Sequence, residues 1–239
     1  MNIILLTAND GLEGDRVVLS DHRARHIQHI LQSVPGDSIR LGMLGGNRGT
    51  GVIENLDGDK VELRVTLDEP PPARHRFELV LALPRPKMLR RVLRTAAEFG
   101  VSHLHLINSA RVEKSYWQSP LLSPERISAA LRSGLERSAD TVEPTVTLHK
   151  RFRPFIEDEL RTLCAGRPCL ITDPLAKQPL SACASEPAVV LVGPEGGFVP
   201  FEVELALSIG AHTAHLGGRI LSVDTALTAA LAQAMPERH

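Results

Sequence analysis

The sequence predicts an α/β protein in which a β-rich segment precedes a larger domain of alternating strands and helices. Three observations carry this prediction. Residues 1 to about 70 hold short strand candidates separated by turn signals, a proline-rich stretch follows at 69–74, and buried apolar runs then alternate with amphipathic helical patterns. Strands that alternate with helices favour a parallel sheet covered on both faces.

Composition places the chain among ordinary globular proteins. Of its 239 residues, 43% are hydrophobic and 23% are charged, and the net charge of −1 means that any basic surface must be local. Three cysteines, Cys164, Cys169 and Cys183, are odd in number and lack CxxC spacing, which favours a reducing compartment without a structural disulfide. The start lacks the basic flank of a signal peptide, and no apolar run approaches the ~18 residues of a membrane span. We therefore expect a cytoplasmic protein without a membrane partner.

The first domain is predicted over residues 1–70. Its strand candidates are Ile3–Leu6, Arg16–Leu19, Ser38–Leu44, Gly51–Leu56 and Lys60–Leu67. Short strands with regular turns suggest a small barrel. A helix is expected over 21–32, with Ile27, Ile30 and Leu31 on one face.

Residues 71–76 are predicted to form an extended linker, because consecutive prolines stiffen the chain. The second domain is then predicted over 77–239. Its strand candidates are Phe77–Leu83, Val101–Ile107, Pro168–Thr172, Ala188–Val192 and His212–Leu216. Its helix candidates are Lys87–Phe99, Ser123–Leu135, 153–163, Phe201–Ile209 and Val223–Met235.

Two glycine-bearing loops follow strands near the end of the chain. Gly193-Pro194-Glu195-Gly196-Gly197 comes directly after the apolar run 188–192, and a second turn-rich segment covers Leu216–Ala226. The first loop fits neither the phosphate-binding GxxxxGK[ST] pattern nor GxGxxG. Glycines let the backbone approach a ligand closely, and an open α/β sheet binds ligands at the ends of its strands. A tight structural turn is the alternative interpretation.

Two basic clusters are candidates for nucleic-acid contact. The first opens the second domain and comprises Arg85, Lys87, Arg90, Arg91 and Arg94. It is either a phosphate-tracking patch or a solvated helix face. The second combines His22, His26 and His29 with Arg23 and Arg25. The favoured interpretation of these histidines is a stripe on the protein surface. The functional alternative is RNA contact by the two arginines. No metal site is expected, because nearby carboxylates are few.

The two glycine loops carry a family resemblance. The sequence resembles the bacterial small-subunit (16S) ribosomal RNA uridine-N3 methyltransferases of the SPOUT class, which have a GPEGG(F/W) loop and then LG-x-RILR-x-ETA before the last helix. Here these motifs are Gly193–Phe198 and Leu216–Ala226. Weaker similarity extends over the whole chain, including 26–37, 81–88, 97–101 and 108–111.

The resemblance implies a PUA-like β-barrel for the first domain and an α/β methyltransferase domain with a carboxy-terminal trefoil knot. It also implies S-adenosylmethionine as the cofactor, ribosomal RNA or the small ribosomal subunit as the partner, and a homodimer. Three loops would hold the cofactor. The residues that they supply are Leu170, Ile171, Thr172, Gly193, Pro194, Gly196, Gly197, Leu216, Gly217, Ile220, Leu221 and Thr225.

The proposed reaction indicates three candidate catalytic residues. Charge that develops on the uracil carbonyl oxygens during N3 methylation would be stabilised by a fixed cation, for which Arg219 is the candidate. Glu195 and Asp224 compete for the role of general base, and Asp224 is equally well interpreted as a helix cap.

Two departures from the family pattern leave the target open. Ser222-Val223-Asp224 replaces the family's R-x-E, and Asp140 stands where an arginine is usual. The alternatives are therefore a non-catalytic RNA-binding or ribosome-assembly factor of the same fold, and a methyltransferase for another RNA. The apolar face of the last helix (226, 227, 230, 231 and 234) could form a dimer interface or pack within one subunit.

Overall fold

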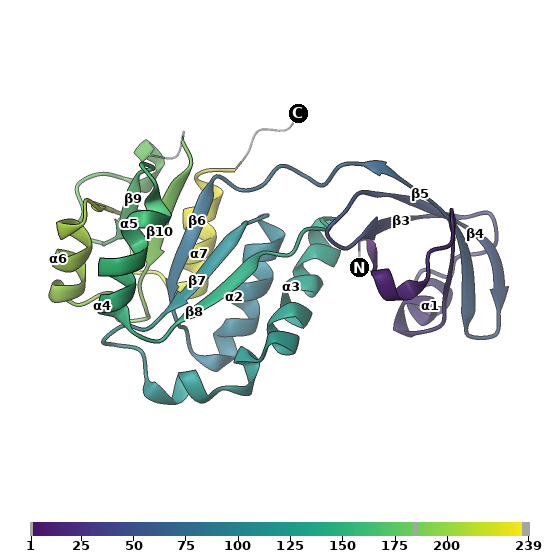
Figure 1. Cartoon of the computed structure of the whole chain (residues 1–239), viewed down its shortest axis with the longest axis horizontal. Helices are drawn as coiled ribbons and strands as arrows, with labels where there is room; N and C mark the ends of the chain where they lie inside the picture. The colour runs from purple at the N-terminus through teal and green to yellow at the C-terminus, as the bar shows by residue number, and fades with distance from the viewer. Residues whose placement is uncertain (1, 184–185, 236–239) are drawn as a thin grey trace. The chain divides into compact units, whose positions relative to one another are not determined.

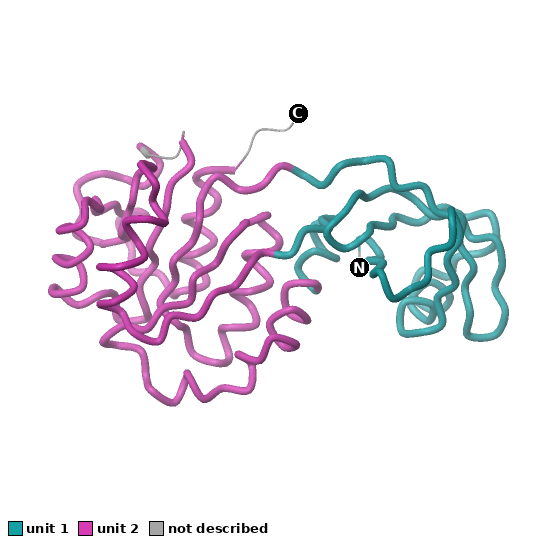
Figure 2. Tube along the Cα trace, in the orientation of Figure 1, with its two compact units in different colours: residues 1–72, 133–143 teal, residues 73–132, 144–239 magenta. Residues whose placement is uncertain are grey.

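The structure is a computed structural model that describes residues 2–183 and 186–235. The side chain of Cys183 lies outside this description. The chain divides into two compact units, residues 1–72 with 133–143 and residues 73–132 with 144–239 (Figure 2). Within the described residues, no helix has the length and apolar character needed to cross a membrane.

A five-stranded sheet forms the first unit (Figure 1). Its strands are β1 (Ile4–Leu6), β2 (Arg16–Leu19), β3 (Ser38–Met43), β4 (Arg48–Asp57) and β5 (Lys60–Glu69). They lie in the order β1-β3-β4-β5-β2, with β1 parallel to β3 and the remaining pairs antiparallel. Alternate residues of these strands face one aliphatic core, as the period-2 pattern predicts.

The helix of the first unit differs from the prediction. An α-helical turn, α1 (His22–Arg25), runs into a π-helical turn over His26–Ile30. Ile27 is fully buried, whereas Ile30 is 70% exposed, and Leu31 is exposed as well. The three residues expected on one face of a helix are therefore not buried together. The wider π turn changes the angular spacing, so residues three and four apart no longer share the buried face.

Residues 133–143 complete the first unit, although the second predicted domain contained them. The backbone N–H of Asn2 donates to the Glu136 carbonyl (2.7 Å), and that of Gly45 donates to the Thr141 carbonyl (2.8 Å). The Thr141 hydroxyl donates in turn to the Gly46 carbonyl (2.5 Å). These bonds attach the segment to both ends of the β1–β3 edge.

The second unit contains a six-stranded, fully parallel sheet, in agreement with the predicted α/β class. Its strands are β6 (Phe77–Ala82), β7 (His103–Ile107), β8 (Thr145–His149), β9 (Cys169–Thr172), β10 (Ala188–Val192) and β11 (His212–Ala214). The order is β11-β9-β10-β6-β7-β8. β8 was not predicted, because this edge strand is only partly covered and its residues do not form an apolar run.

Helices cover both faces of this sheet (Figure 1). They are α2 (Pro86–Glu98), α3 (Pro124–Ser138), α4 (Phe152–Pro154), a π-helical turn (Phe155–Leu160), α5 (Arg161–Cys164), α6 (Pro200–Ser208) and α7 (Val223–Ala232). Short 3₁₀ segments occur at Ala8–Asp10, Lys114–Gln118, Pro120–Leu122 and Leu180–Cys183. The 152–164 segment and α6 pack on one face, while α7 contacts β10 and α2.

The apolar face of α7 is used within the unit. Leu227, Ala230, Leu231 and Ala234 are all buried, so of the two roles that the sequence left open this face packs in the core. His75 fixes the end of the helix, because its Nε2 lies 2.9 Å from the Leu231 carbonyl and its Nδ1 accepts from the Phe77 N–H (2.9 Å). The ring is therefore a neutral Nε2–H tautomer, and its burial lowers its pKa.

Candidate active site

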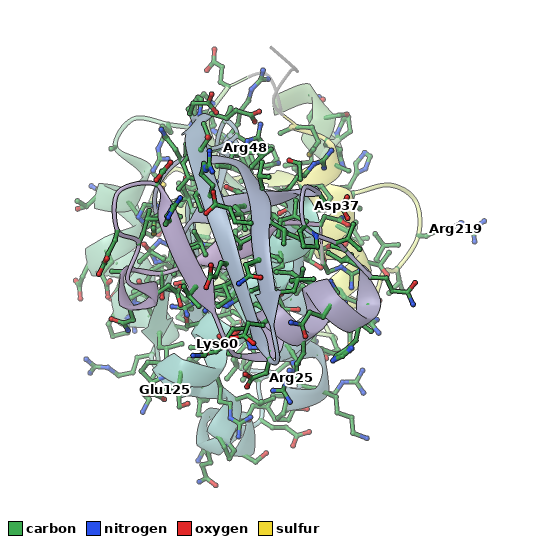
Figure 3. All side chains as sticks on the ribbon, turned by 90° about the vertical axis from the view of Figure 1, so that its right-hand side faces the viewer. Arg25, Asp37, Arg48, Lys60, Glu125 and Arg219 are labelled. Carbon is green, nitrogen blue, oxygen red and sulfur yellow. The ribbon has the colours of Figure 1, made fainter. Side chains whose placement is uncertain are left out.

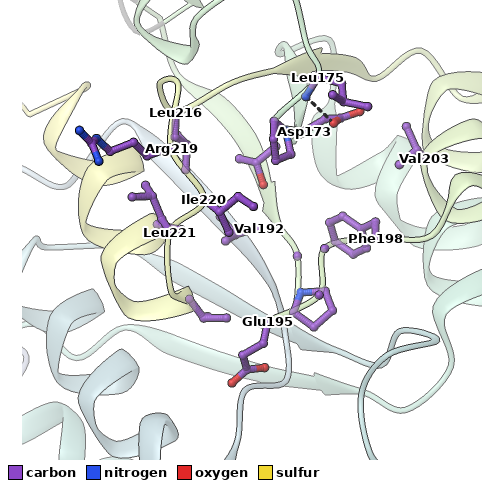
Figure 4. Close-up of a pocket in the computed structure, with 18 of the residues that line it drawn as sticks. Asp173, Leu175, Val192, Glu195, Phe198, Val203, Leu216, Arg219, Ile220 and Leu221 are labelled. Carbon is purple, nitrogen blue, oxygen red and sulfur yellow. Dashed lines mark hydrogen bonds between the residues drawn. The ribbon is translucent and has the colours of Figure 1, made fainter.

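A cavity of about 670 Å³ lies at the carboxyl ends of β9 and β10, and the segment that follows β11 also lines it (Figure 4). Its lining residues come from four segments that the parallel sheet brings to one edge: 172–175, 192–204, 216–221, and the start of α7 at Val223 and Ala226. The carboxyl ends of parallel strands meet at the same edge, which is why two loops distant in the sequence share one cavity.

Most of the predicted cofactor residues lie on this cavity. Those that line it are Thr172, Gly193, Pro194, Gly196, Gly197, Leu216, Gly217, Ile220 and Leu221. Leu170 and Ile171 do not; they are buried within β9. Thr225 is also absent from the lining, and its hydroxyl lies 2.9 Å from the Ser222 hydroxyl.

The Gly193–Gly197 loop is tightly folded. A Cβ added at Gly193 would lie 3.1 Å from the Phe198 backbone nitrogen, and Gly197 takes a left-handed φ of 71°. The left-handed φ favours glycine at position 197, and a Cβ at position 193 would force its neighbours to shift. The Arg111 guanidinium, from the loop after β7, donates to the carbonyl oxygens of Gly196 and Gly197 and holds the loop from outside.

A buried glutamate that the sequence did not single out ties this region together. Glu202 is 3% exposed, its Oε1 accepts from the Ala110 N–H (2.7 Å), and its Oε2 accepts from the Val199 N–H (3.0 Å). One carboxylate thus joins the start of α6 to the loop after β7. A glutamate at the third position of a helix that opens with proline was the available signal.

Four charged side chains line the cavity: Asp173, Glu195, Glu204 and Arg219. Three carboxylates and one guanidinium give it a formal charge of −2. Glu195 is partly neutralised, because Arg85 donates to its Oε1 at 3.0 Å. In Figure 4 the Glu195 carboxylate points away from the labelled apolar side chains of the cavity.

Arg219 lies on the rim. Its side chain is exposed, and it extends away from the ribbon in Figure 3 and away from the cavity interior in Figure 4. Reaching a group inside the cavity would require a change of rotamer.

Asp224 does not line the cavity. Its Oδ2 accepts from the Arg91 guanidinium (2.7 Å), and its Oδ1 accepts from the Ser222 hydroxyl (2.6 Å). The Ser222 hydrogen bond and then that from Arg91 lower the pKa of Asp224. Ser222 and Asp224, which together form the first departure from the family pattern, therefore bond to each other.

The second departure, Asp140, also has a structural role. It is buried, and its Oδ1 accepts from the backbone N–H groups of Thr141 (2.7 Å) and Val142 (3.2 Å). The carboxylate thus stabilises the turn that follows α3.

The predicted RNA-contacting residues differ in availability. Arg23 is internal: its side chain is 11% exposed, it pairs with Asp10 (2.5 Å) and Asp21 (2.9 Å), and it donates to the Leu5 carbonyl (2.7 Å). Arg25 is exposed. Arg23 therefore stabilises the first unit and is not free to contact RNA.

Ion pairs occupy three of the five predicted cations on α2 and directly before it. Arg85 pairs with Glu195, Arg91 with Asp224, and Arg94 with Glu98 (3.5 Å). Lys87 and Arg90 are exposed, and neither forms an ion pair with the described part of the chain.

The three histidines of the first unit differ in exposure. His22 and His29 are exposed and His26 is half-buried, with burial lowering its pKa. Over residues 2–183 and 186–235, no three His, Cys, Asp or Glu side chains are grouped to hold a metal ion.

A parallel α/β unit with glycine loops around a cavity at its strand ends is typical of ligand-binding domains. Comparison with known proteins makes the class specific. Residues 71–235 match the RNA methyltransferase domain family. The chain belongs to this family.

Curated relatives and solved structures agree with that assignment. The chain is 29% identical over 246 aligned positions to ribosomal RNA small subunit methyltransferase E of Treponema pallidum, covering 100% of this chain and 92% of the relative. A probable rRNA-methyltransferase from Porphyromonas gingivalis has a similar structure (TM-score 0.72, 26% identity, 96% and 95% of the two chains). The fold also resembles ribosomal RNA small subunit methyltransferase E from Neisseria gonorrhoeae bound to S-adenosyl methionine (TM-score 0.74, 24% identity, 97% and 95%).

Proposed function

We propose that this protein is an S-adenosylmethionine-dependent methyltransferase that methylates N3 of a uridine in 16S ribosomal RNA. The observation that carries the proposal is the cavity built by the Gly193–Gly197 and Leu216–Leu221 loops in a member of the RNA methyltransferase family. Relatives named for small-subunit ribosomal RNA methylation support the choice of substrate.

The cavity suits the cofactor in size and charge. About 670 Å³ lies within the ~300–1,000 Å³ typical of small-molecule sites. The formal charge of −2 on its lining favours a ligand that carries a sulfonium and an ammonium group. Backbone groups of the two glycine loops would bind the polar parts of the ligand, and Val192, Leu216 and Leu221 would contact its apolar surface. When bound, the cofactor supplies an electrophilic methyl group.

Arg219 is our candidate for the electrostatic role. Its exposed guanidinium is on the cavity rim, so it can turn toward an incoming base and stabilise charge on a uracil carbonyl oxygen. Of the two base candidates, Glu195 is the better supported, because it lines the cavity. Asp224 lies outside the lining, and its lowered pKa makes it a weaker proton acceptor.

RNA would be held by local positive charge. We propose that Lys87 and Arg90 on α2, together with Arg25 of the first unit, contact phosphates, since these side chains are exposed and the chain as a whole carries no basic excess. The five-stranded sheet of the first unit would then be a PUA-like barrel that assists RNA binding, and 71–76 would be the linker between the domains.

We also propose a trefoil knot in the second unit. The segment after β11 runs beside the segment after β9: the His215 N–H donates to the Gln178 carbonyl (2.9 Å), and the Leu180 N–H donates to the His215 carbonyl (2.9 Å). The chain then returns to place α7 against β10. A return path past residues 178–180 is what a knotted carboxy terminus requires.

A homodimer and a cytoplasmic location complete the proposal. Leu175 and Ile220 line the cavity yet are each 90% exposed, and a second copy of the chain over the cavity mouth would bury them. Light scattering should therefore give twice the chain mass, and Ile220→Asp should shift the protein toward the monomer. A ribosomal RNA substrate is made and assembled in the cytoplasm.

Calorimetry with S-adenosylmethionine tests the cofactor, and nucleoside mass spectrometry of methylated RNA tests the product. We expect micromolar binding and N3-methyluridine in 16S RNA. The assay should include deproteinised RNA, assembled small subunits and bulk tRNA, and the absence of product from all three would overturn the proposal.

Another RNA target is the second candidate, favoured by one observation. Asp224 and Ser222, which replace the family's acidic and basic residues, bond to each other, and Asp224 pairs with Arg91. A site rearranged in this way could accept a different nucleotide. Mass spectrometry of ribosomal RNA from a deletion strain separates the two, because only the 16S substrate predicts the loss of N3-methyluridine there.

A third candidate keeps the fold without the chemistry: an RNA-binding or ribosome-assembly factor. It predicts RNA binding that is unchanged by Arg219→Ala and by the cofactor, whereas the methyltransferase predicts that Arg219→Ala slows methyl transfer.

A further inference from the structure

The only tyrosine and the only tryptophan of the chain are neighbours, Tyr116 and Trp117. They lie in the 3₁₀ segment Lys114–Gln118, which we call the aromatic segment. Neither side chain is buried, whereas Phe77 and Phe155 are almost completely enclosed in the core. Both residues are only partly buried, so part of each stays accessible to a ligand.

Hydrogen bonds at the edges of both rings fix the aromatic segment. Trp117 donates its indole N–H to Asn108 Oδ1 (2.9 Å), and the Tyr116 hydroxyl donates to Glu113 Oε1 (3.2 Å). The Ser119 N–H also donates to the Tyr116 carbonyl (3.1 Å). Rings that are held in place lose little conformational entropy when a flat ligand stacks on them.

The aromatic segment belongs to the loop that supports the cavity. Arg111, five residues before Tyr116, donates to the carbonyl oxygens of Gly196 and Gly197 in the cavity wall. Partial desolvation and the hydrogen bond to Glu113 raise the pKa of Tyr116. The aromatic segment is thus joined to the cavity wall through Arg111.

We propose that the aromatic segment binds an unpaired nucleotide that flanks the methylated base, by stacking the nucleobase on Tyr116 and Trp117. The inference rests on the proposed RNA methyltransferase function and deepens it. Aromatic side chains recognise single-stranded RNA through base stacking, which requires bases that are not paired. The exposed cations Lys87 and Lys114 would contact the adjoining phosphates.

Because Trp117 is the only tryptophan, its fluorescence reports directly on this segment. We would titrate the full chain, without cofactor, with a single-stranded oligoribonucleotide of about 12 nucleotides, within the site sizes typical of single-strand binders. The same sequence in a duplex is the comparison. Saturable quenching by the single strand, and much weaker quenching by the duplex, is expected.

Substitutions then assign the contact. Tyr116→Leu removes the ring and should weaken RNA binding about 5- to 150-fold, the range expected for one stacked base. Tyr116→Phe keeps the ring and should stay near the wild type. Phe201→Leu is the matched control, because it removes an exposed ring on α6 that does not line the cavity. Calorimetry with S-adenosylmethionine should give the same affinity for all three variants.

Three results would overturn the proposal: no quenching by single-stranded RNA, equal quenching by the duplex, or Tyr116→Leu binding RNA as tightly as the wild type. If Tyr116→Leu impaired only the methylation of assembled subunits and not the binding of naked RNA, the segment would contact a protein, and the proposal would fail on that ground too. Because the titration needs neither cofactor nor methyl transfer, failure of the proposed enzymatic function is recognised separately.

Discussion

Glu202 provides the sharpest test of how the cavity wall is held. Its carboxylate is 3% exposed and accepts from two backbone N–H groups, of Ala110 at 2.7 Å and of Val199 at 3.0 Å. Hydrogen bonds to a charged group contribute about 1.5–3 kcal/mol each, and a buried donor left without a partner adds its own penalty.

The isosteric change Glu202→Gln removes the charge and turns one acceptor into a donor that faces a backbone N–H. We expect it to lower the free energy of unfolding of the second unit by about 2–3 kcal/mol, and Glu202→Ala to lower it by about 3–5 kcal/mol. Glu204→Gln, an exposed position two residues along α6, is the control and should stay within about 0.5 kcal/mol of the wild type.

Urea denaturation followed by Trp117 fluorescence measures this unit specifically, because the only tryptophan lies in it. With a slope of about 1–3 kcal/mol per molar urea, the Glu202→Gln midpoint should fall by about 1 M or more. An unchanged midpoint, or an equal loss in Glu204→Gln, would show that Glu202 does not stabilise the wall.

Three further predictions follow from local geometry and ionisation. Gly193→Ala would bring a Cβ to 3.1 Å from the Phe198 nitrogen and should weaken S-adenosylmethionine binding by about tenfold or more. Gly218→Ala is the control, because its Cβ meets open space, and it should change the affinity less than about twofold. Equal effects of the two substitutions in calorimetry would contradict the proposed role of the tight loop. The hydrogen bond from Arg23 lowers the pKa of Asp10 from 3.8 to about 2. The pair should therefore stabilise the first unit by about 2 kcal/mol above about pH 4, and this contribution should be lost as the pH falls toward 2. In acid unfolding, Asp10→Asn should reduce the pH dependence of the free energy of unfolding between about pH 4 and pH 2. Burial lowers the pKa of His75 below 6.5, so the unfolded chain binds a proton at a pH where the folded chain does not. The second unit should therefore lose stability as the pH falls through 6.5, and His75→Gln should show a smaller loss in urea unfolding over the same range. The same pH dependence in both proteins would refute the role given to His75.

The sequence predicted the parallel sheet well, because its central strands are continuous apolar runs flanked by turns. Val189–Leu191 is fully buried between β6 and β9, and such a run has few alternatives. The edge strand β8 was missed because an exposed edge imposes little pattern on Thr145–His149. The π turn at His26–Ile30 was missed because apolar periodicity does not distinguish it from an α-helix.

At the candidate site, the glycine loops were identifiable because backbone constraints leave a local signature. The partners of charged side chains were not, since they depend on contacts between distant segments. Asp224 pairs with Arg91 across 133 positions, and Arg23 is internal because Asp10 lies beside it in the fold. A solvated cation and a buried one look alike in a sequence.

The first unit consists of two segments that are separated in the sequence, and this affects when it can fold during synthesis. Asn2 bonds to Glu136, and Gly45 to Thr141, so these backbone groups before β1 and after β3 lack their partners until residues 133–143 exist. During synthesis, the first 72 residues leave the ribosome before α2, β7 and α3 have all been translated. A fragment ending at Pro72 would lack these partners permanently, so the isolated unit should be produced together with residues 133–143.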